Sequence, residues 1–156
     1  MQLADSIRKA RQIQNKLSHP SCAAVIVAAG SSARMGGTDK ILAELGGLPV
    51  LSRTLRVFDD HDMIDTIIVV AREEQMPKIS RVCSPYHKVR IVVPGGNSRQ
   101  ESVMHGLEAV PEETELVAVH DGARLVVTPE VITYAILEVS KFGAAAPAIP
   151  VKDTIK

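Results

Sequence analysis

The sequence lacks several features that mark common classes of protein. Lys and Arg number 18, as do Asp and Glu, so the formal net charge is zero and no basic excess favours a nucleic-acid surface. Aromatic residues make up 3% of the chain and Trp is absent, which argues against a platform for stacking single-stranded nucleic acid. No apolar run reaches the roughly 20 residues of a membrane-spanning helix, and the N-terminus lacks the apolar core of a secretory signal. We therefore expect a cytoplasmic protein.

Cysteine is also scarce, and the two cysteines, Cys22 and Cys83, have no spacing typical of a metal site. We expect both to be reduced thiols. Apolar residues, in contrast, make up 46% of the 156 residues, enough for the core of one domain. Apolar residues at helical spacing over residues 2–17 predict an amphipathic helix. The chain is thus predicted to divide into an N-terminal helix within residues 1–20 and a domain over residues 21–156.

Strand and helix signals alternate along the predicted domain. Short apolar runs predict strands over residues 23–28, 66–71, 89–93, 115–119 and 144–149. Helical patterns lie between them, over residues 50–59, 73–83, 98–110 and 128–142. This alternation predicts an α/β fold: a three-layer, mostly parallel twisted sheet with helices on both faces. Ligands of such sheets bind at the carboxyl ends of the strands, so functional residues are expected in the segments that follow the strands.

The segment after the first predicted strand has small residues followed by two cations. It reads VIVAAGSSARMGGTDK over residues 25–40 and matches neither the P-loop nor the dinucleotide fingerprint. The small side chains of Ala28, Ala29 and Gly30 would let backbone N–H groups approach an anion. Arg34 and Lys40 supply positive charge for phosphate. The alternative interpretation is an ordinary turn with two solvated cations.

Polar residues also follow the later strands. In PGGNSRQES, Ser98 and Ser102 would either cap the following helix or contact a ligand. In HDGAR, Asp121 is suited to hold Mg²⁺ through oxygen, unless it only caps a turn, and Arg124 would bind a second anion. In PVKDTIK, Thr154 lies where a further ligand contact is expected. Together these residues suit nucleotidyl transfer, in which catalysis is positioning and charge stabilisation.

The motifs resemble a known family. AAGSSARMGGTDK is similar to the signature loop of the nucleotidyltransferase superfamily. GGNSRQESVMHGL, HDGAR and PVKDTIK, in this order, resemble 2-C-methyl-D-erythritol 4-phosphate cytidylyltransferases. The resemblance extends over residues 23–156 and implies a Rossmann-like nucleotidyltransferase fold. It also implies transfer of CMP from CTP to methylerythritol phosphate, with release of pyrophosphate, in non-mevalonate synthesis of isoprenoid precursors.

The resemblance further implies a role for each candidate residue. Arg34 and Lys40 would stabilise the transition state at the α-phosphate, and Asp121 would ligate Mg²⁺. Arg124 and Thr154 would hold methylerythritol phosphate. The CTP site would be lined by Ala28, Ala29 and Gly30 and, at the cytosine edge, by Gly96 and Asn97 with Ser102 close by.

The sequence departs from the family's pattern at several places. The usual Pro-Lys-Gln is replaced by residues 38–41, TDKI, so the interval between Arg34 and Lys40 is shortened. Gly122 and Leu125 replace the usual Ala and Pro. Family members continue beyond the DTIK motif into a dimerisation arm, so we expect the domain to be incomplete and a homodimer only with that arm. The alternatives are a nucleotidyltransferase for ribitol phosphate or a molybdenum cofactor, and a nucleotide-binding fragment without turnover.

Overall fold

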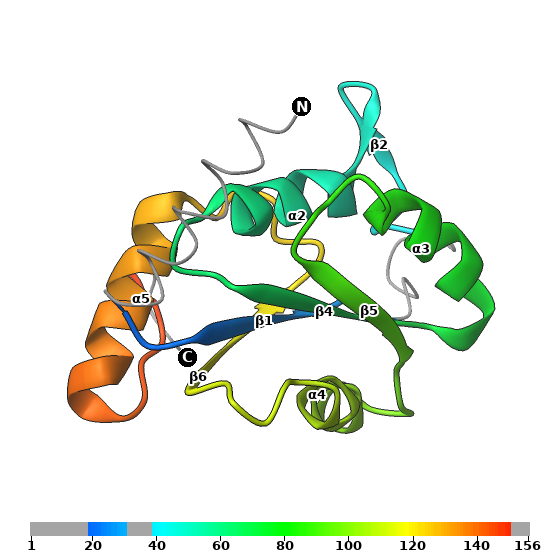
Figure 1. The fold of residues 1–156 in the computed structure, drawn as a ribbon. Helices are drawn as coiled ribbons and strands as arrows, with labels where there is room; N and C mark the ends of the chain where they lie inside the picture. The colour runs from blue at the N-terminus through cyan, green and yellow to red at the C-terminus, as the bar shows by residue number, and fades with distance from the viewer. Residues whose placement is uncertain (1–18, 31–38, 151–156) are drawn as a thin grey trace, which may run out of the picture.

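A four-stranded parallel sheet forms the centre of the computed structural model, which describes residues 19–30 and 39–150 (Figure 1). Its strands lie in the order β5-β4-β1-β6. Their bounds are Cys22–Val27 for β1, Thr66–Ala71 for β4, Val89–Pro94 for β5 and Leu116–Asp121 for β6. β1 and β4 are the two inner strands, which explains why their sequences, CAAVIV and TIIVVA, are apolar on both faces.

Helices cover both faces of this sheet. They are α2 (Val50–Asp60), α3 (Met76–Cys83), α4 (Arg99–Glu108) and α5 (Pro129–Phe142), and a short 3₁₀ turn, η2 (Glu73–Gln75), precedes α3. Figure 1 shows α2 and α3 over one face and α4 under the other. Ile132 and Ile136 of α5 belong to the same buried cluster as the apolar residues of α2 and α3. The predicted three-layer α/β fold is therefore confirmed.

The alternation of side chains along the inner strands explains the two halves of the core. Ile26 and Val69 belong to the larger cluster under α2, α3 and α5, whereas Val25, Ile68 and Val70 form the smaller one under α4. Each of these five side chains is fully buried, and full burial of one Val or Ile side chain contributes about 1.5–3 kcal/mol.

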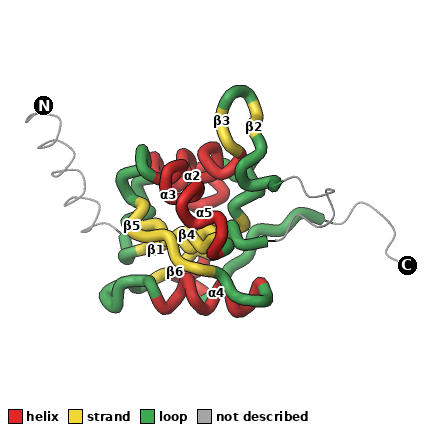
Figure 2. The backbone as a smooth tube through the Cα atoms, turned by 90° about the vertical axis from the view of Figure 1, so that its right-hand side faces the viewer, coloured by secondary structure: helices red, strands yellow, loops and turns green. Residues whose placement is uncertain are grey.

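A small hairpin joins the first loop to α2. It consists of β2 (Glu44–Leu45) and β3 (Leu48–Pro49), and Figure 2 shows it projecting from the body of the protein. The turn of the hairpin falls at Gly46 and Gly47, whose φ values are 58° and 75°. Two consecutive positive φ angles are what a tight hairpin of this kind requires, and glycine adopts them without a Cβ penalty.

The predicted strand over residues 144–149 is wrong. α5 ends at Gly143, which has a φ of 79°, and residues 144–150 form neither helix nor strand and are exposed. Pro147 and Pro150 have no N–H to donate to a neighbouring strand, and Ala has a low preference for strands. The prediction was wrong because it relied on the apolar composition of this segment alone. In the described part of the chain β6 pairs with β1 and with no second strand.

Other boundaries shifted by a few residues. α4 spans Arg99–Glu108, whereas the prediction was 98–110, because Ser98 is its N-cap. The predicted helix over residues 73–83 is divided into η2 and α3, and Pro77 lies in the first turn of α3, where its missing N–H costs little. The predicted helix over residues 2–17 lies outside the described residues. Among the described helices, none has the length and apolar character needed to cross a membrane.

Candidate active site

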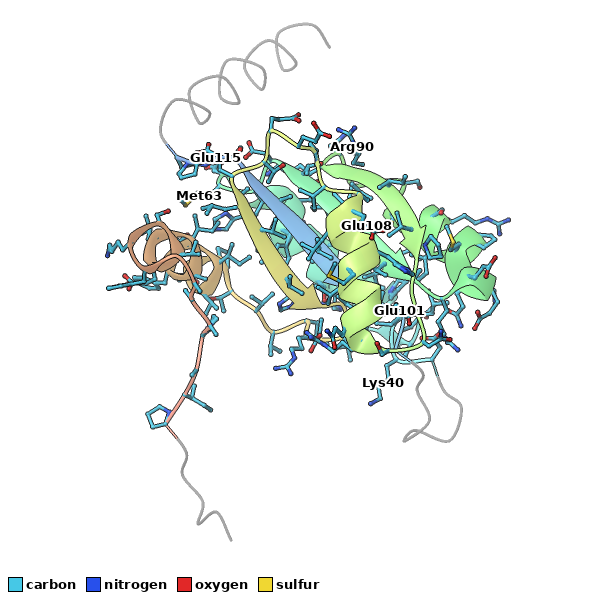
Figure 3. The ribbon with its side chains drawn as sticks, turned by 90° about the horizontal axis from the view of Figure 1, so that it is seen from below. Lys40, Met63, Arg90, Glu101, Glu108 and Glu115 are labelled. Carbon is cyan, nitrogen blue, oxygen red and sulfur yellow. The ribbon has the colours of Figure 1, made fainter. Side chains whose placement is uncertain are left out.

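A cleft of about 610 Å³ lies at the carboxyl ends of the strands, where the sequence predicted a ligand site. Figure 3 shows the side chain of Lys40 at the end of the sheet where α4 begins. The cleft is lined by Val27, Ala29, Gly30, Lys40, Ile41, Arg72, Gly96, Asn97, Ser98, Arg99, Ser102, Asp121 and Ala123. Most of the predicted site residues are therefore brought together.

The remaining predicted residues lie elsewhere. Ala28 is buried beneath the cleft, and its N–H donates to the carbonyl of Val70 at 2.7 Å, so that this N–H is not offered to an anion. Arg124 is not among the residues that line the cleft, but it forms an ion pair with Asp121, which does line it. Arg34 and Thr154 lie outside the described residues, and their roles stay predictions.

The loop after β5 is fixed onto the start of α4 by side-chain hydrogen bonds. The N–H of Gly96 donates to Ser102 Oγ at 3.0 Å, and the N–H of Asn97 donates to Glu101 Oε2 at 2.7 Å. Ser102 is 3% exposed, and its hydroxyl donates to the carbonyl of Ser98 at 2.9 Å. Ser98 Oγ accepts from the N–H of Glu101, which makes Ser98 a helix cap, as one of the two interpretations held. Ser102 therefore shapes the loop, and the N–H groups of Gly96 and Asn97 are already engaged.

The loops after β1 and β5 touch each other. A Cβ atom at Gly95 would overlap the side chain of Ala29 and would lie 3.0 Å from Ser102 Oγ. Any larger residue at position 95 would have to push these loops apart. The close approach explains why the sequence has glycine here, and it holds two walls of the cleft at a fixed distance.

Asp121 lies between two arginines. Its Oδ1 accepts from Arg99 Nη2 at 2.9 Å, and its Oδ2 accepts from Arg124 Nε at 2.8 Å. Partial burial alone would raise the pKa of Asp121, but the hydrogen bonds from Arg99 and Arg124 outweigh it and hold the pKa below its ordinary value. The carboxylate is thus an anion at neutral pH, in a part of the cleft that is otherwise cationic.

The segment that carries Asp121 is attached to the sheet and to α2. The N–H of Gly122 donates to the carbonyl of Val27 at 2.8 Å, and the buried hydroxyl of Thr54 donates to the carbonyl of Gly122 at 2.9 Å. His120 packs on Phe58, with ring centroids 5.0 Å apart, and its Nε2 lies 3.0 Å from the carbonyl of Arg124. Burial lowers the pKa of His120, so it is a neutral packing residue here.

Lys40 lies in a turn with defined anchors on either side. Asp39, before it, accepts from Arg72 Nη2 at 3.0 Å and from the N–H of Ile41 at 3.0 Å. Ile41, after it, is buried, and its carbonyl accepts from the N–H of Leu51 at 3.0 Å. Lys40 lines the cleft although the interval between it and Arg34 in the sequence is short.

Sequence reasoning missed Arg72 and Arg99, which both line the cleft. Arg72 directly follows β4, so the rule that ligands bind after strands would have found it. Arg99 is the first residue of α4, and only the order of strands in the sheet shows that it faces Asp121.

The donor set suits a metal that arrives with a nucleotide. Within residues 19–30 and 39–150, no cluster of three or more His, Cys, Asp or Glu side chains could form a protein cage for a metal. Among the described residues that line the cleft, Asp121 alone carries a carboxylate. Mg²⁺ in nucleotide sites is commonly bound by one or two carboxylates together with phosphate oxygens and water, so the residues present fit such an ion.

A parallel sheet with a cleft at the carboxyl ends of its strands, lined by Lys40, Arg72 and Arg99, is typical of nucleotide-binding α/β proteins. Within that class, residues 22–156 match the family described as 2-C-methyl-D-erythritol 4-phosphate cytidylyltransferase. The chain belongs to this family, which confirms the resemblance carried by the three motifs.

Individual relatives agree with this assignment. A 2-C-methyl-D-erythritol 4-phosphate cytidylyltransferase of Clostridium botulinum is 41% identical over 135 residues, covering 85% of this chain and 59% of the relative. A Bacillus licheniformis protein of the same name is 44% identical over 135 residues, covering 85% of this chain and 58% of the relative. The chain thus spans less than two thirds of the length of these relatives.

Solved structures share the fold. The 4-diphosphocytidyl-2C-methyl-D-erythritol synthase of Anaerococcus prevotii superposes with a TM-score of 0.69 at 32% identity, covering 83% of this chain and 53% of that chain. The Rv0371c protein of Mycobacterium tuberculosis superposes with a TM-score of 0.62 at 24% identity, covering 77% of this chain and 60% of that one. The second likeness concerns the fold alone.

Proposed function

We propose that the protein transfers CMP from CTP to 2-C-methyl-D-erythritol 4-phosphate and releases pyrophosphate. The observation that carries the proposal is the meeting of Lys40, Asp121 and the Gly96 loop in one cleft, in a chain of this family. The product would serve isoprenoid precursor synthesis, and we expect the reaction to take place in the cytoplasm. The choice of substrates is supported by the relatives from Clostridium botulinum and Bacillus licheniformis, which are named as cytidylyltransferases of 2-C-methyl-D-erythritol 4-phosphate.

The loop after β5 suits the cytosine base. Because the N–H groups of Gly96 and Asn97 are engaged by Ser102 and Glu101, their carbonyl oxygens and the Asn97 amide are the polar groups left to the base. A carbonyl accepts from the exocyclic amine of cytosine, which uracil lacks. The rigid loop would therefore favour CTP over UTP.

The reacting phosphates would lie near Lys40. In the proposed reaction an oxygen of the acceptor phosphate attacks the α-phosphorus of CTP, and the bond from that phosphorus to the pyrophosphate oxygen breaks. The protein supplies no nucleophile; it aligns the two substrates and stabilises the negative charge of the transition state. Lys40, together with Arg34, would provide that stabilisation, while Arg124 and Thr154 would hold the acceptor phosphate.

Asp121 would hold Mg²⁺ with the triphosphate. The ion, when bound, would neutralise phosphate charge and align the triphosphate. Each Asp121 oxygen accepts from one guanidinium in this structure, and Oδ2, which accepts a single hydrogen bond, keeps a second lone pair, so the carboxylate could hold the ion while Arg99 and Arg124 stay in contact with it. The remaining N–H groups of either guanidinium could donate charge-assisted hydrogen bonds to a phosphate oxygen.

Pyrophosphate release provides the test. The chain is incubated with CTP and Mg²⁺ and with methylerythritol phosphate, ribitol phosphate or no acceptor. Release that depends on methylerythritol phosphate is the expected result. Release only with ribitol phosphate would assign the alternative acceptor, and CTP binding measured by calorimetry without release under any condition would leave a nucleotide-binding protein without turnover.

The homodimer implied for family members with a C-terminal arm stays a prediction. Its test is the mass in solution, by light scattering, of this chain and of a chain extended to the length of its relatives. We expect the dimer only for the longer chain.

A further inference from the structure

Arg72 and Asp39 form an ion pair beside the cleft that the proposed chemistry does not use. Arg72 Nη2 lies 3.0 Å from Asp39 Oδ2, and the two side chains are 30% and 19% exposed. They are therefore shielded from water more than the Arg56–Asp60 pair on α2, whose side chains are 73% and 72% exposed at 3.7 Å. A partly buried ion pair of good geometry holds its partners more firmly than an exposed one.

This pair joins two segments that are distant in sequence. Arg72 follows β4, and its position is set by the inner strand of the sheet. Asp39 begins the turn that contains Lys40, and it closes that turn by accepting from the N–H of Ile41 at 3.0 Å and, through its backbone carbonyl, from the N–H of Ala43 at 2.9 Å. The carboxylate of Asp39 thus connects the Lys40 turn to the rigid centre of the protein.

The pair also removes an electrostatic problem. Asp39 is a carboxylate next in sequence to Lys40, which lines the cleft proposed to hold the triphosphate. Without a partner, its charge would repel a triphosphate. Arg72 lines the same cleft and neutralises Asp39, while its Nη1 lies 3.3 Å from the more exposed Glu74.

We infer that Arg72 is a positioning residue for Lys40, acting through Asp39. The guanidinium holds Asp39, Asp39 holds the turn, and the turn presents Lys40 to the cleft. The inference deepens the proposed function and rests on it for the role of Lys40. It also gives a reason for the departure of residues 38–41 from the family's pattern. In this chain Asp39, which is paired with Arg72, precedes Lys40, whereas the family usually has Pro before its Lys.

The first experiment requires no ligand. Amide hydrogen exchange at Ile41 and Ala43 is compared in the unmodified chain and in Arg72→Gln, with Arg56→Gln as a matched control that removes an exposed ion pair. We expect exchange at both amides to accelerate about tenfold in Arg72→Gln, because the turn opens locally, and to stay unchanged in the control. Unchanged exchange in Arg72→Gln would overturn the inference, whether or not the protein transfers CMP.

The second experiment uses a double-mutant cycle on pyrophosphate release, with Arg72→Gln, Asp39→Asn and the double variant. Misplacing Lys40 is expected to lower kcat about tenfold, with less than about a twofold change in the KM for CTP. If Arg72 acts through Asp39, adding Arg72→Gln to Asp39→Asn lowers kcat no further. Equal losses in both backgrounds would mean that Arg72 contacts the nucleotide directly, and the inference would be wrong. Absence of release from the unmodified chain counts against the proposed function, and the exchange experiment then decides the inference.

Discussion

The hydroxyl of Thr54 donates a 2.9 Å hydrogen bond to the carbonyl of Gly122, across 68 residues of sequence. Thr54 is fully buried in α2, and Gly122 directly follows Asp121. The bond therefore connects the helical layer to the segment that carries Asp121 and Arg124. It satisfies the carbonyl of Gly122, which lies between the cleft-lining residues Asp121 and Ala123, and it helps to fix the direction in which this segment leaves β6.

Replacing Thr54 by Val tests this connection. Val has a similar shape but no hydroxyl, so the carbonyl of Gly122 loses its buried partner. We expect a loss of about 1–3 kcal/mol in the free energy of unfolding, measured by urea denaturation. Thr54→Ser, which keeps the hydroxyl and removes one methyl group, is expected to lose less than Thr54→Val; the reverse order would show that packing, and not the hydrogen bond, is what matters at this position.

Gly106 of α4 provides a second test, of packing. A Cβ atom at Gly106 would overlap the side chain of Val25 and lie 2.9 Å from Cγ2 of Val70. We expect Gly106→Ala to lower the free energy of unfolding by about 1–3 kcal/mol, although Ala is the better helix former, because overpacking outweighs propensity. Met104→Ala on the same helix, at a side chain that is 50% exposed, is the control and should change stability by less than about 0.5 kcal/mol. A stabilised Gly106→Ala variant would contradict the tight contact.

Asp121 is expected to make stability depend on pH in acid. Its pKa in the folded protein is lower than the ordinary value of 3.8, since Arg99 and Arg124 stabilise the anion more than burial destabilises it. As the pH falls, the Asp121 carboxylate therefore binds a proton in the unfolded chain before it does so in the folded protein. The stabilisation is complete above pH 3.8 and is lost as the pH falls toward the pKa of the folded protein.

Denaturation curves of the unmodified chain and of Asp121→Asn, measured between acid and neutral pH, check this. The free energies of unfolding of the two proteins should differ by a constant amount around neutral pH, and this difference should shrink in acid. Asp60→Asn, in the exposed pair with Arg56, is the matched control and should follow the unmodified chain throughout. A difference that grows as the pH falls would mean that the carboxylate is not stabilised by the two arginines.

The two cysteines should be unreactive in the folded protein. Burial raises the pKa of Cys83 to about 12, and burial together with the nearby charge of Asp65 raises that of Cys22 to about 12. At pH 8 only about one thiol in ten thousand would then be a thiolate, the form that reacts with alkylating agents. We expect mass spectrometry to find neither cysteine alkylated by iodoacetamide in the native chain and both alkylated in urea. Fast alkylation of the native chain would place a thiol at the surface.

The inner strands were predictable because burial on both faces leaves a strong signal. CAAVIV and TIIVVA are apolar without interruption, and helices with one apolar stripe lie between the strands. Residues 144–149 gave a similar apolar signal without a strand, since composition does not show whether a partner strand is present to accept the hydrogen bonds.

The site was predictable where chemistry follows a strand directly. Asp121 ends β6 and Gly96 follows β5 closely, and both line the cleft. Lys40 also lines it, from the longer loop after β1. The partners that fix them were not found. The hydrogen bonds from Thr54 to Gly122 and from Arg72 to Asp39 join segments whose proximity depends on the order of the strands. No local pattern encodes that order.

The central position of β1 determines when the cleft can exist. β1 pairs with β4 on one side and with β6 on the other, and the register joins Val27 to Asp121. A ribosome delivers the chain from its N-terminus, so the segment around Ala29 and Gly30 emerges long before the carboxylate that completes the cleft. Contacts over such long separations form late and slowly in folding. A ligand of this cleft would therefore bind only in the final stage of folding, after β6 has paired with β1.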